Sequence, residues 1–226
     1  MLLVPKLAGR MAIQRLHPLA RISALDAVPR LLRMAASHTA QLYNLSELAA
    51  PFQFSRPTIG DYVTLLERIF LLERLPPWHS NHASRLVKTP KMHLGDTGLA
   101  CGLLGLDAAT LSADRARLGP LLETFVFQEL RRQASWHTHD HAFFHFRDRD
   151  KVEVDIVIER DAHRLAGVEV KAAATVTPAD SKGLRRLSDR AGRHFRGGVL
   201  LHAGTGTLPL ETENCLVVPL ARLWDM

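Results

Sequence analysis

Apolar and polar positions alternate most regularly along residues 152–171, in two runs separated by a short polar segment. In the first run, one side of the alternation is apolar and the other is acidic: Val152, Val154, Ile156 and Ile158 against Glu153, Asp155 and Glu159. The second run places Glu169 and Lys171 on one face and two valines on the other. A period of two is typical of β-strands, and the polar segment 160–164 is typical of a turn. The pattern therefore predicts a β-hairpin.

A turn symmetric about Ala162 fixes the register of this hairpin. The facing pairs are then Asp155 and Glu169, Glu153 and Lys171, and Val154 and Val170. Two carboxylates in directly opposite positions have Cβ atoms roughly 4.5–5.5 Å apart and repel each other. Water can screen them on a solvated outer face, with Lys171 as the counter-charge. Alternatively, a divalent cation such as Mg²⁺ can bind between them. The pattern leaves both interpretations open.

Helical spacing dominates the chain before residue 110. Residues 42–75 predict a helix-turn-helix, with a short first helix at 44–50 and a second helix that Ser55 and Pro57 begin. The expected apolar stripe of the second helix consists of Ile59, Val63, Leu66, Ile69 and Phe70. The opposite face carries Arg56, Thr58, Asp61 and Tyr62, and such a helix could enter a DNA major groove. Asp61, which phosphate repels, and Gly60, which lowers helix propensity, count against this interpretation. A small helical packing module with no role in DNA binding fits the same spacing.

A β-ribbon is expected next, with strands at 71–75 and 91–94. Its rim carries Arg85, Lys88 and Lys91, which suit contact with phosphates. An ordinary solvated surface loop is the alternative. A short helix at 95–106 then leads into a connection at 107–116.

The pattern of residues 111–226 predicts the element order α-β-β-β-α-β. The first helix has a strongly apolar face made of Leu118, Leu121, Leu122, Phe125, Val126 and Leu130. A strand at 142–147 and the hairpin follow, then a helix opened by Thr177 and Pro178 and a buried strand at 197–202. This order predicts an α/β domain with a mixed sheet. We therefore expect two domains, 1–110 and 111–226.

Composition and charge narrow the classes of protein. The chain has 226 residues, 46% of them hydrophobic, and a net charge of +6. Residues 1–110 hold 12 Lys and Arg against 7 acidic residues, whereas residues 111–226 hold 17 against 16, so the basic excess lies in the first half. That distribution favours a nucleic-acid partner for the first half. The sequence has no run of 18 apolar residues, so it predicts no membrane span. The two cysteines lack metal-ligand spacing, so a reduced, cytoplasmic setting is expected.

Other catalytic motifs are missing from the sequence. No Gly-rich loop is followed by Gly-Lys-Ser/Thr, which excludes a P-loop ATP site in this chain, and no Gly-x-Ser-x-Gly elbow is present. Four histidines at 137, 139, 141 and 145 could bind Zn²⁺. No Cys or carboxylate set completes such a site, so a loop followed by a strand is the preferred interpretation.

The strand order, with an Asp on one hairpin strand and Glu-x-Lys on the next, resembles that of the PD-(D/E)XK nuclease superfamily. Residues 19–222 also resemble the C-terminal part of a prokaryotic family of AAA-type ATPases. The segments that carry this second resemblance are 27–33, 45–48, 55–58, 74–80, 85–91, 96–100, 122–126, 154–157 and 167–172. The ATPase module itself is not in this sequence, which suggests a truncated product or an isolated C-terminal fragment.

The resemblance implies a winged helix followed by a nuclease-like domain. By position, Asp155, Glu169 and Lys171 would form the catalytic constellation, with Glu123 as a supporting carboxylate. The two acids Asp155 and Glu169 would hold Mg²⁺ or Mn²⁺. The expected function is nucleic-acid binding with metal-dependent phosphodiester cleavage. The alternative is a non-catalytic regulatory module that binds DNA or a partner, such as a separate ATPase module or a second copy of the chain.

Overall fold

The computed structural model describes residues 27–80, 89–161 and 164–225. The chain divides into two compact units. The described part of the first unit is 27–74 and 89–114, and that of the second is 75–80, 115–161 and 164–225. Residues 75–80, which the sequence pattern placed in the ribbon of the first domain, thus group with the second unit. Among the described residues, no helix is long and apolar enough to cross a membrane.

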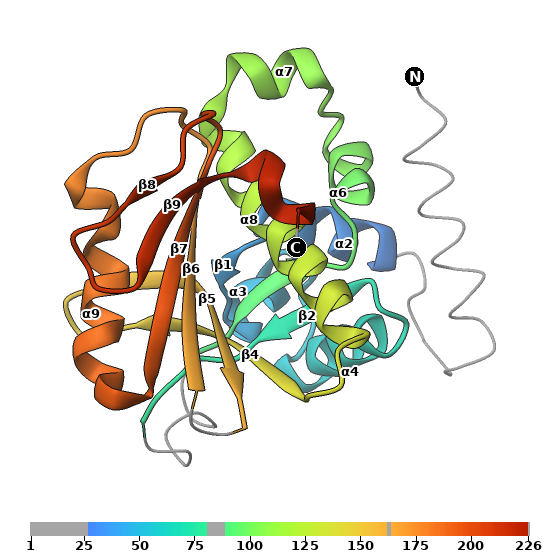
Figure 1. Cartoon of the computed structure of the whole chain (residues 1–226). Coiled ribbons are helices and arrows are strands. Elements are labelled where there is room, and N and C mark those ends of the chain that lie inside the picture. Colours follow the sequence, from blue (N-terminus) through green and yellow to red (C-terminus); the bar gives the residue numbers. More distant parts are fainter. Residues whose placement is uncertain (1–26, 81–88, 162–163, 226) are drawn as a thin grey trace. The chain divides into compact units, whose positions relative to one another are not determined.

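The first unit combines short helices with a small sheet (Figure 1). Its elements up to the end of the second predicted helix are α2 (Ala27–Ser37), β1 (Gln41–Leu42), α3 (Leu45–Ala49), η1 (Ala50–Phe52) and α4 (Arg56–Arg68). They are followed by β2 (Leu72–Leu75), β3 (Lys91–Leu94), α6 (Thr97–Leu104) and α7 (Ala108–Ala113). The sheet has the order β1-β3-β2. The two-residue strand β1 is too short to give a sequence signal.

The two helices predicted between residues 42 and 75 are present, and their caps explain where they begin. Asn44 accepts a hydrogen bond from the Ser46 N–H (2.9 Å), and Ser55 Oγ accepts one from the Thr58 N–H (3.3 Å). Such caps satisfy N–H groups that have no partner within the helix. Gln53, with φ of 56°, makes the turn between them.

The buried stripe of α4 is shorter than the one predicted. Ile59, Val63 and Leu66 are buried, but Phe70 is 78% exposed. The helix ends at Arg68, and Phe70 adopts a left-handed conformation with φ of 60°. The chain therefore leaves the helical path before Phe70 could join the stripe.

The second unit is built on a mixed six-stranded sheet in the order β4-β5-β6-β7-β9-β8. Its elements up to the first 3₁₀ turn are α8 (Arg115–Ser135), β4 (His141–Arg147), β5 (Glu153–Arg160), β6 (Arg164–Lys171) and η2 (Pro178–Ser181). The rest are α9 (Lys182–Ala191), η3 (Gly192–His194), β7 (Phe195–His202), β8 (Leu208–Pro209), β9 (Cys215–Pro219) and η4 (Leu220–Trp224). Strands β4, β5 and β6 pair antiparallel, whereas β7 is parallel to β6 and β9. The expected α/β class and mixed sheet are confirmed.

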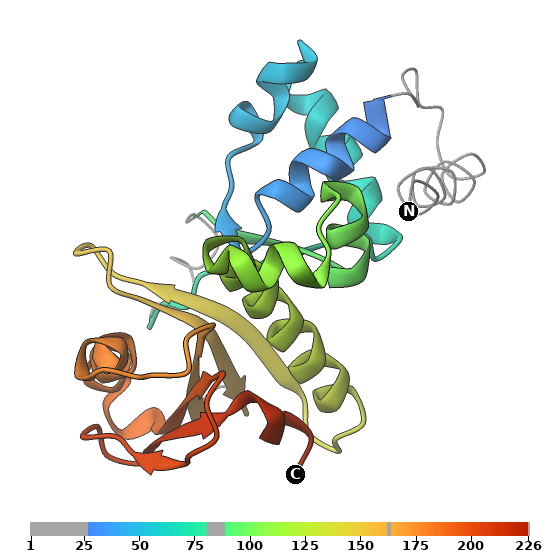
Figure 2. The same cartoon turned by 90° about the horizontal axis from the view of Figure 1, so that it is seen from above.

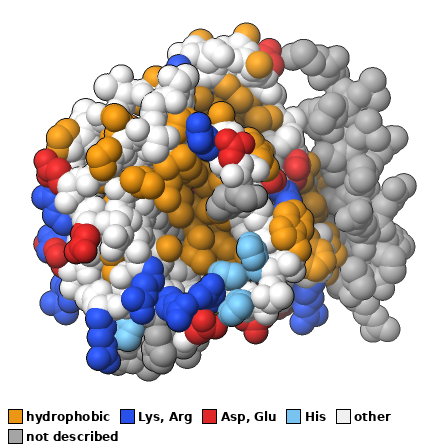
Figure 3. All heavy atoms as spheres, in the orientation of Figure 1, with side chains coloured by type: hydrophobic (Ala, Val, Ile, Leu, Met, Phe, Trp, Pro, Cys, Tyr) orange, Lys and Arg blue, Asp and Glu red, His pale blue; other side chains and the backbone are white. Residues whose placement is uncertain are grey.

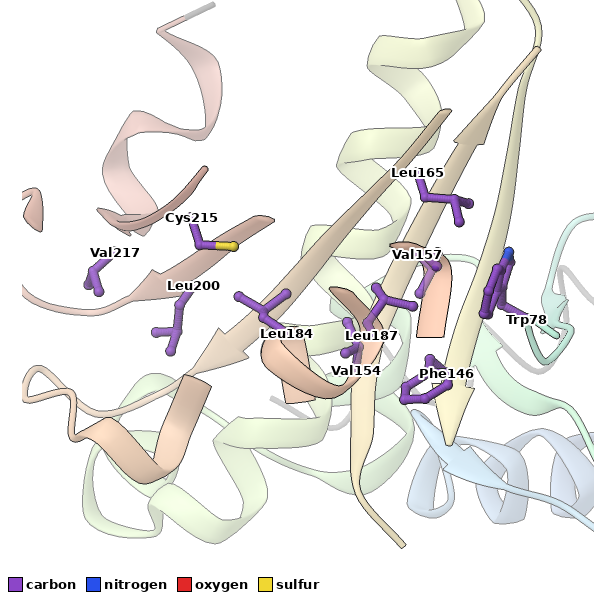
Figure 4. Close-up of a cluster of buried hydrophobic side chains, with 11 residues drawn as sticks. Trp78, Phe146, Val154, Val157, Leu165, Leu184, Leu187, Leu200, Cys215 and Val217 are labelled. Atoms are coloured by element: carbon purple, nitrogen blue, oxygen red, sulfur yellow. The ribbon is translucent and has the colours of Figure 1, made fainter. Parts of the chain in front are cut away.

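Helices cover both faces of this sheet, as Figure 2 shows for α8 on one side and α9 on the other. On the α9 face, Leu184 and Leu187 pack with Val154, Val157 and strand residues further along the sheet (Figure 4). On the α8 face, the buried core consists of Val126, Phe127, Ile156, Val168 and Leu201, joined by Leu75 and Leu223. The hairpin therefore has no broad solvated face, so screening by water alone does not account for the acidic residues on it.

Trp78, which follows the first strand of the predicted ribbon, belongs to the buried core on the α9 face. Trp78 is buried and packs near Phe146, with ring centroids 6.2 Å apart. The backbone N–H of Trp78 donates to the His145 carbonyl (2.6 Å), and the backbone N–H of His145 donates to the Pro76 carbonyl (2.9 Å). Residues 76–78 thus pair with the outer strand β4, whose backbone groups would otherwise be unpaired.

A β-bulge in β5 breaks the alternation that the sequence predicted. Along β4, Phe144 pairs with Val157 and Phe146 with Val154, so β5 holds one extra residue between these pairs. As a result, Val154 and Val157 both face α9, whereas Ile156 and Ile158 face α8. The expectation that Val154, Ile156 and Ile158 share one face is wrong. Bulges of this kind bend a strand and redirect a side chain, and the residue redirected here is Asp155.

Candidate functional site

Asp155, Glu169 and Lys171 lie where β5 and β6 stop pairing. The described pairs run from Arg160 with Arg164 to Ile156 with Val168, the register expected for a turn centred on Ala162. The ladder then ends. In its place, the Asp155 carboxylate accepts a hydrogen bond from the Val170 N–H (2.9 Å).

The three facing pairs predicted beyond Ile156 are therefore not formed. A side chain of β5 occupies the position that a backbone carbonyl would take in a continuing ladder, and the bulge places it there. Asp155 consequently points along the sheet toward β6 instead of standing opposite Glu169 across a regular pair.

Alternate residues of β6 face α9 and the turn that precedes it. Leu184 and Leu187 pack over Gly167, and Gly183 lies over Glu169 so closely that a Cβ on Gly183 would overlap the Glu169 carboxylate. Glu169 and Lys171 are thus on one face, as the sequence predicted, and they lie under the amino-terminal end of α9.

Glu169 is a buried acid with 6% of its surface exposed. A buried carboxylate is costly unless nearby groups compensate its charge. Gly183 is in the first turn of α9, where the helix dipole favours negative charge. The absence of a side chain at Gly183 allows the carboxylate to approach this backbone.

Lys171 forms an ion pair with Asp180, with Nζ and Oδ1 3.4 Å apart. The other oxygen of Asp180 accepts hydrogen bonds from the Thr177 N–H and hydroxyl, each at 2.8 Å, which makes a capping box. Burial acts to raise the pKa of Asp180, but the hydrogen bonds from Thr177 and the charge of Lys171 outweigh it and lower this pKa below its usual value. Asp180 therefore carries a negative charge beside Lys171 at neutral pH.

Asp180 is a site residue that the sequence interpretation missed. Thr177 and Pro178 were expected to open a helix, but the partner of the lysine was not identified. The spacing Thr-x-x-Asp from Thr177 to Asp180 is a recognisable capping-box signal. It could have placed Asp180 at the helix start, although not next to Lys171.

His202 lies beside Lys171 in the parallel ladder between β6 and β7. It is buried, with Nδ1 3.0 Å from the Ala174 carbonyl oxygen and Nε2 3.0 Å from that of Gly206. These contacts connect the loops after β6 and β7, which fixes the backbone where Lys171 emerges.

Glu123, the predicted supporting carboxylate, is a half-buried residue of α8. Arg115 at the start of this helix donates a hydrogen bond to the Ala172 carbonyl, so α8 begins beside the end of β6. However, no three His, Cys, Asp or Glu side chains among the described residues converge as metal ligands. Glu123 therefore does not join Asp155 and Glu169 in a three-ligand cluster.

The residues predicted to contact nucleic acid are only partly available. Arg56 is exposed, and the Thr58 hydroxyl lies 2.8 Å from the Ser55 hydroxyl at the start of α4. Tyr62 was expected on the polar face, but it is 6% exposed and packs on Phe54, with centroids 5.6 Å apart. Its ring extends the apolar side of the helix, because Phe54 in the preceding turn covers it.

Lys91 also differs from the prediction. It was expected on the basic rim of the ribbon, but it lies in β3 with only 4% of its surface exposed. Its backbone pairs with Leu42 of β1, a strand that the sequence pattern did not reveal. The other two rim residues, Arg85 and Lys88, lie outside the described residues.

Comparisons with known proteins match both halves of the chain to domains without an assigned function. Residues 15–110 match the family model of a domain of unknown function (DUF8612), and residues 118–223 match that of another (DUF4143). Uncharacterised proteins of Mycobacterium tuberculosis and Mycobacterium bovis are each 29% identical to the chain over 152 residues. The matched region is 67% of this chain, and the chain spans about a third (33%) of the length of each of these relatives. No solved structure matches the chain.

Proposed function

We propose that the second unit is a metal-dependent phosphodiesterase acting on nucleic acid, of the PD-(D/E)XK type. The observation that carries the proposal is the end of β5–β6 pairing at Asp155, with Glu169 and Lys171 on the neighbouring strand. A strand bulge that redirects an acid beside a buried acid and a lysine is costly for a sheet, and such bulges are common next to active sites.

The donor set fits a hard divalent cation. Mg²⁺ in phosphate-processing sites is commonly bound by one or two carboxylates, with water and substrate phosphate completing its coordination. Asp155 and Glu169 provide such a pair, and Mn²⁺ accepts the same oxygen ligands. When bound, the ion would lower the pKa of a water molecule and polarise the scissile phosphate.

The side chains then have separate roles in hydrolysis. The hydrogen bond from the Val170 N–H holds Asp155 in one orientation, and the missing side chain of Gly183 leaves room for the Glu169 carboxylate beside α9. Lys171 exchanges its contact with Asp180 for a phosphate oxygen, where its charge stabilises the transition state. Water oxygen bonds to phosphorus, one P–O ester bond breaks, and the departing oxygen takes up a proton. The products are a phosphate monoester and a hydroxyl.

A cleavage assay tests this proposal. Labelled single- and double-stranded DNA are incubated with Mg²⁺ or Mn²⁺ and either the wild type or Asp155→Asn. We expect cleavage by the wild type and at least about a hundredfold slower cleavage by the variant, because a neutral amide is a poor ligand for the cation. Arg185→Gln, an exposed substitution on α9, is the matched control and should cleave like the wild type. Equal cleavage by all three proteins, or none by the wild type, would reject the assignment.

We further propose that the first unit is a winged helix that binds duplex DNA. The order α2-β1-α3-α4-β2-β3, with β3 between the other two strands, supports this, as does the exposed Arg56 at the start of α4.

The DNA affinity of the full chain should fall with salt if this is correct. Each phosphate contact contributes a slope of roughly −0.9 in a plot of log K against log salt concentration. Arg56→Gln should weaken binding and make the slope shallower by about one unit. Fluorescence anisotropy of a labelled duplex measures both. A salt-independent affinity, or an unchanged slope in the variant, would contradict the proposal.

The second candidate function is a non-catalytic module that binds DNA or a partner, such as an ATPase supplied elsewhere. The observation that favours it is that Lys171 and Asp155 are both engaged in internal contacts. The DUF4143 match also supports it, because this domain is usually found in AAA-ATPase-associated proteins. The cleavage assay distinguishes the two, since a scaffold role predicts no metal-dependent products.

A further inference from the structure

A pocket of about 620 Å³ lies between the carboxyl-terminal half of α8 and the hairpin end of the sheet. Its apolar floor consists of Leu130, Ala134, Phe143, Ile158 and Ala166. Figure 3 shows apolar side chains gathered in the hollow on this face, with basic and histidine side chains along its lower edge. The volume is within the range of small-molecule sites, roughly 300–1,000 Å³.

Three arginines surround the pocket: Arg160, Arg164 and Arg196. Arg160 forms an ion pair with Asp161 (3.2 Å), which offsets one of these charges. Within the described part of the chain, Arg164 and Arg196 have no acidic partner. Arg160 and Arg164 are also a facing pair in the hairpin, and like charges in that position repel. An anion between the guanidinium groups would relieve this repulsion.

Two polar atoms in the pocket wall have no hydrogen-bond partner among the residues described. They are Gln133 Oε1 and His141 Nδ1, both buried. Gln133 Nε2 donates to the Leu223 carbonyl (2.9 Å), so Oε1 is the atom of this amide that lacks a partner. His141 packs edge-on against His137, with centroids 5.7 Å apart. Buried polar atoms without partners are rare and call for an explanation, and a bound ligand provides one.

We propose that this pocket binds a small organic anion with an aromatic, hydrogen-bonding body, of the size and chemistry of a nucleoside monophosphate. The base would lie on the apolar floor beside Phe143. Its amino group and ring nitrogen would reach Gln133 Oε1 and His141 Nδ1 after small side-chain rotations. The phosphate would lie between Arg164 and Arg196, because guanidinium groups bind phosphate through paired hydrogen bonds.

This site is separate from the proposed cleavage site. Arg164 and Lys171 are at opposite ends of β6, about 23 Å apart at roughly 3.3 Å per residue. The pocket opens on the α8 face, whereas Glu169 and Lys171 face α9. The inference therefore does not depend on the proposed function.

Titration of the full chain with adenosine 5′-monophosphate by isothermal calorimetry tests the inference. We expect Arg164→Gln and Arg196→Gln each to raise Kd about tenfold, because each removes charged hydrogen bonds to the phosphate. Arg185→Gln, an exposed arginine on the other face, is the matched control and should leave Kd unchanged. Ala134→Phe should fill the pocket and abolish binding. If this variant does not fold, the two arginine variants still test the inference.

Octanoate and inorganic phosphate are the comparison ligands. Octanoate has an apolar body and an anionic head but cannot pair with Gln133, and phosphate has no body to cover the floor. We expect both to bind at least about tenfold more weakly than the nucleotide. Octanoate binding as tight as that of the nucleotide would overturn the inference in favour of a fatty-acid site. No nucleotide binding, or equal binding by all the arginine variants, would also overturn it.

Discussion

Lys171→Met is expected to slow the proposed metal-dependent cleavage by at least about a hundredfold, the usual effect of losing one charged group that stabilises a transition state. Methionine keeps most of the length and apolar surface of the side chain and removes only its charge. The Asp155 and Glu169 carboxylates remain, so the stabilisation of the protein by Mg²⁺ in thermal denaturation should be unchanged. Single-turnover cleavage and thermal midpoints with and without Mg²⁺ measure the two effects separately.

Asp180→Asn is the matched control for this experiment. It removes the charge that holds Lys171 in the resting structure, while an amide oxygen can still accept hydrogen bonds from Thr177. If Lys171 acts on the substrate, cleavage by Asp180→Asn should stay within about threefold of the wild type or rise. If Lys171 serves only as a structural partner of Asp180, the two variants should lower stability alike and should not differ in activity. That second outcome would rule out the catalytic role of Lys171.

Gly183→Ala is expected to lower the free energy of unfolding by about 2–3 kcal/mol, as is typical when a methyl group is forced into a filled space. The added Cβ would overlap the Glu153 carbonyl oxygen and the Glu169 carboxylate. A backbone oxygen in a central strand cannot move aside as the end of a flexible side chain can. Alanine also gains roughly 0.5–1 kcal/mol of helix propensity over glycine, but the overlap exceeds this gain. The rate of the proposed cleavage should also fall, because Glu169 would have to move from its position beside α9.

Gly60→Ala provides the comparison for this substitution. Gly60 is also helical, in α4, and the nearest atom to an added Cβ is Leu45 Cδ1 at 3.8 Å, an ordinary contact. The same change should therefore leave stability equal or increase it by up to about 1 kcal/mol. Differential scanning calorimetry of both variants measures the contrast. Similar midpoints for Gly183→Ala and the wild type would show that α9 does not pack on Glu169 as described.

Local signals in the sequence were sufficient for many of the elements, although not for β1, or for α7, which lies in the predicted connection at 107–116. Ser55 and Pro57 predicted the start of a helix, and the capping hydrogen bond to Thr58 explains why. The alternation around residues 160–164 predicted the hairpin, and the described pairs, from Ile156 with Val168 to Arg160 with Arg164, have the expected register. The class of the second unit followed from the order of its helices and strands. All these features depend on neighbours within a few residues, so the chain specifies them locally.

Tertiary packing decided which faces are buried. Tyr62 is buried because Phe54 covers its ring, and Lys91 is buried in a strand that pairs with β1. Trp78 belongs to the second unit because residues 76–78 complete the edge of β4. Each outcome depends on a contact between segments that a periodic pattern does not relate.

The candidate site shows the same division. The sequence by itself placed Asp155, Glu169 and Lys171 on adjacent strands, since residue spacing determines which strand carries each. Only the tertiary structure supplied the bulge that turns Asp155 toward Val170, the glycine of α9 over Glu169, and the pairing of Lys171 with Asp180. The physical reason is that strand alternation is a local property of the backbone. The place where a ladder ends depends on helices and loops that pack on it from elsewhere in the chain.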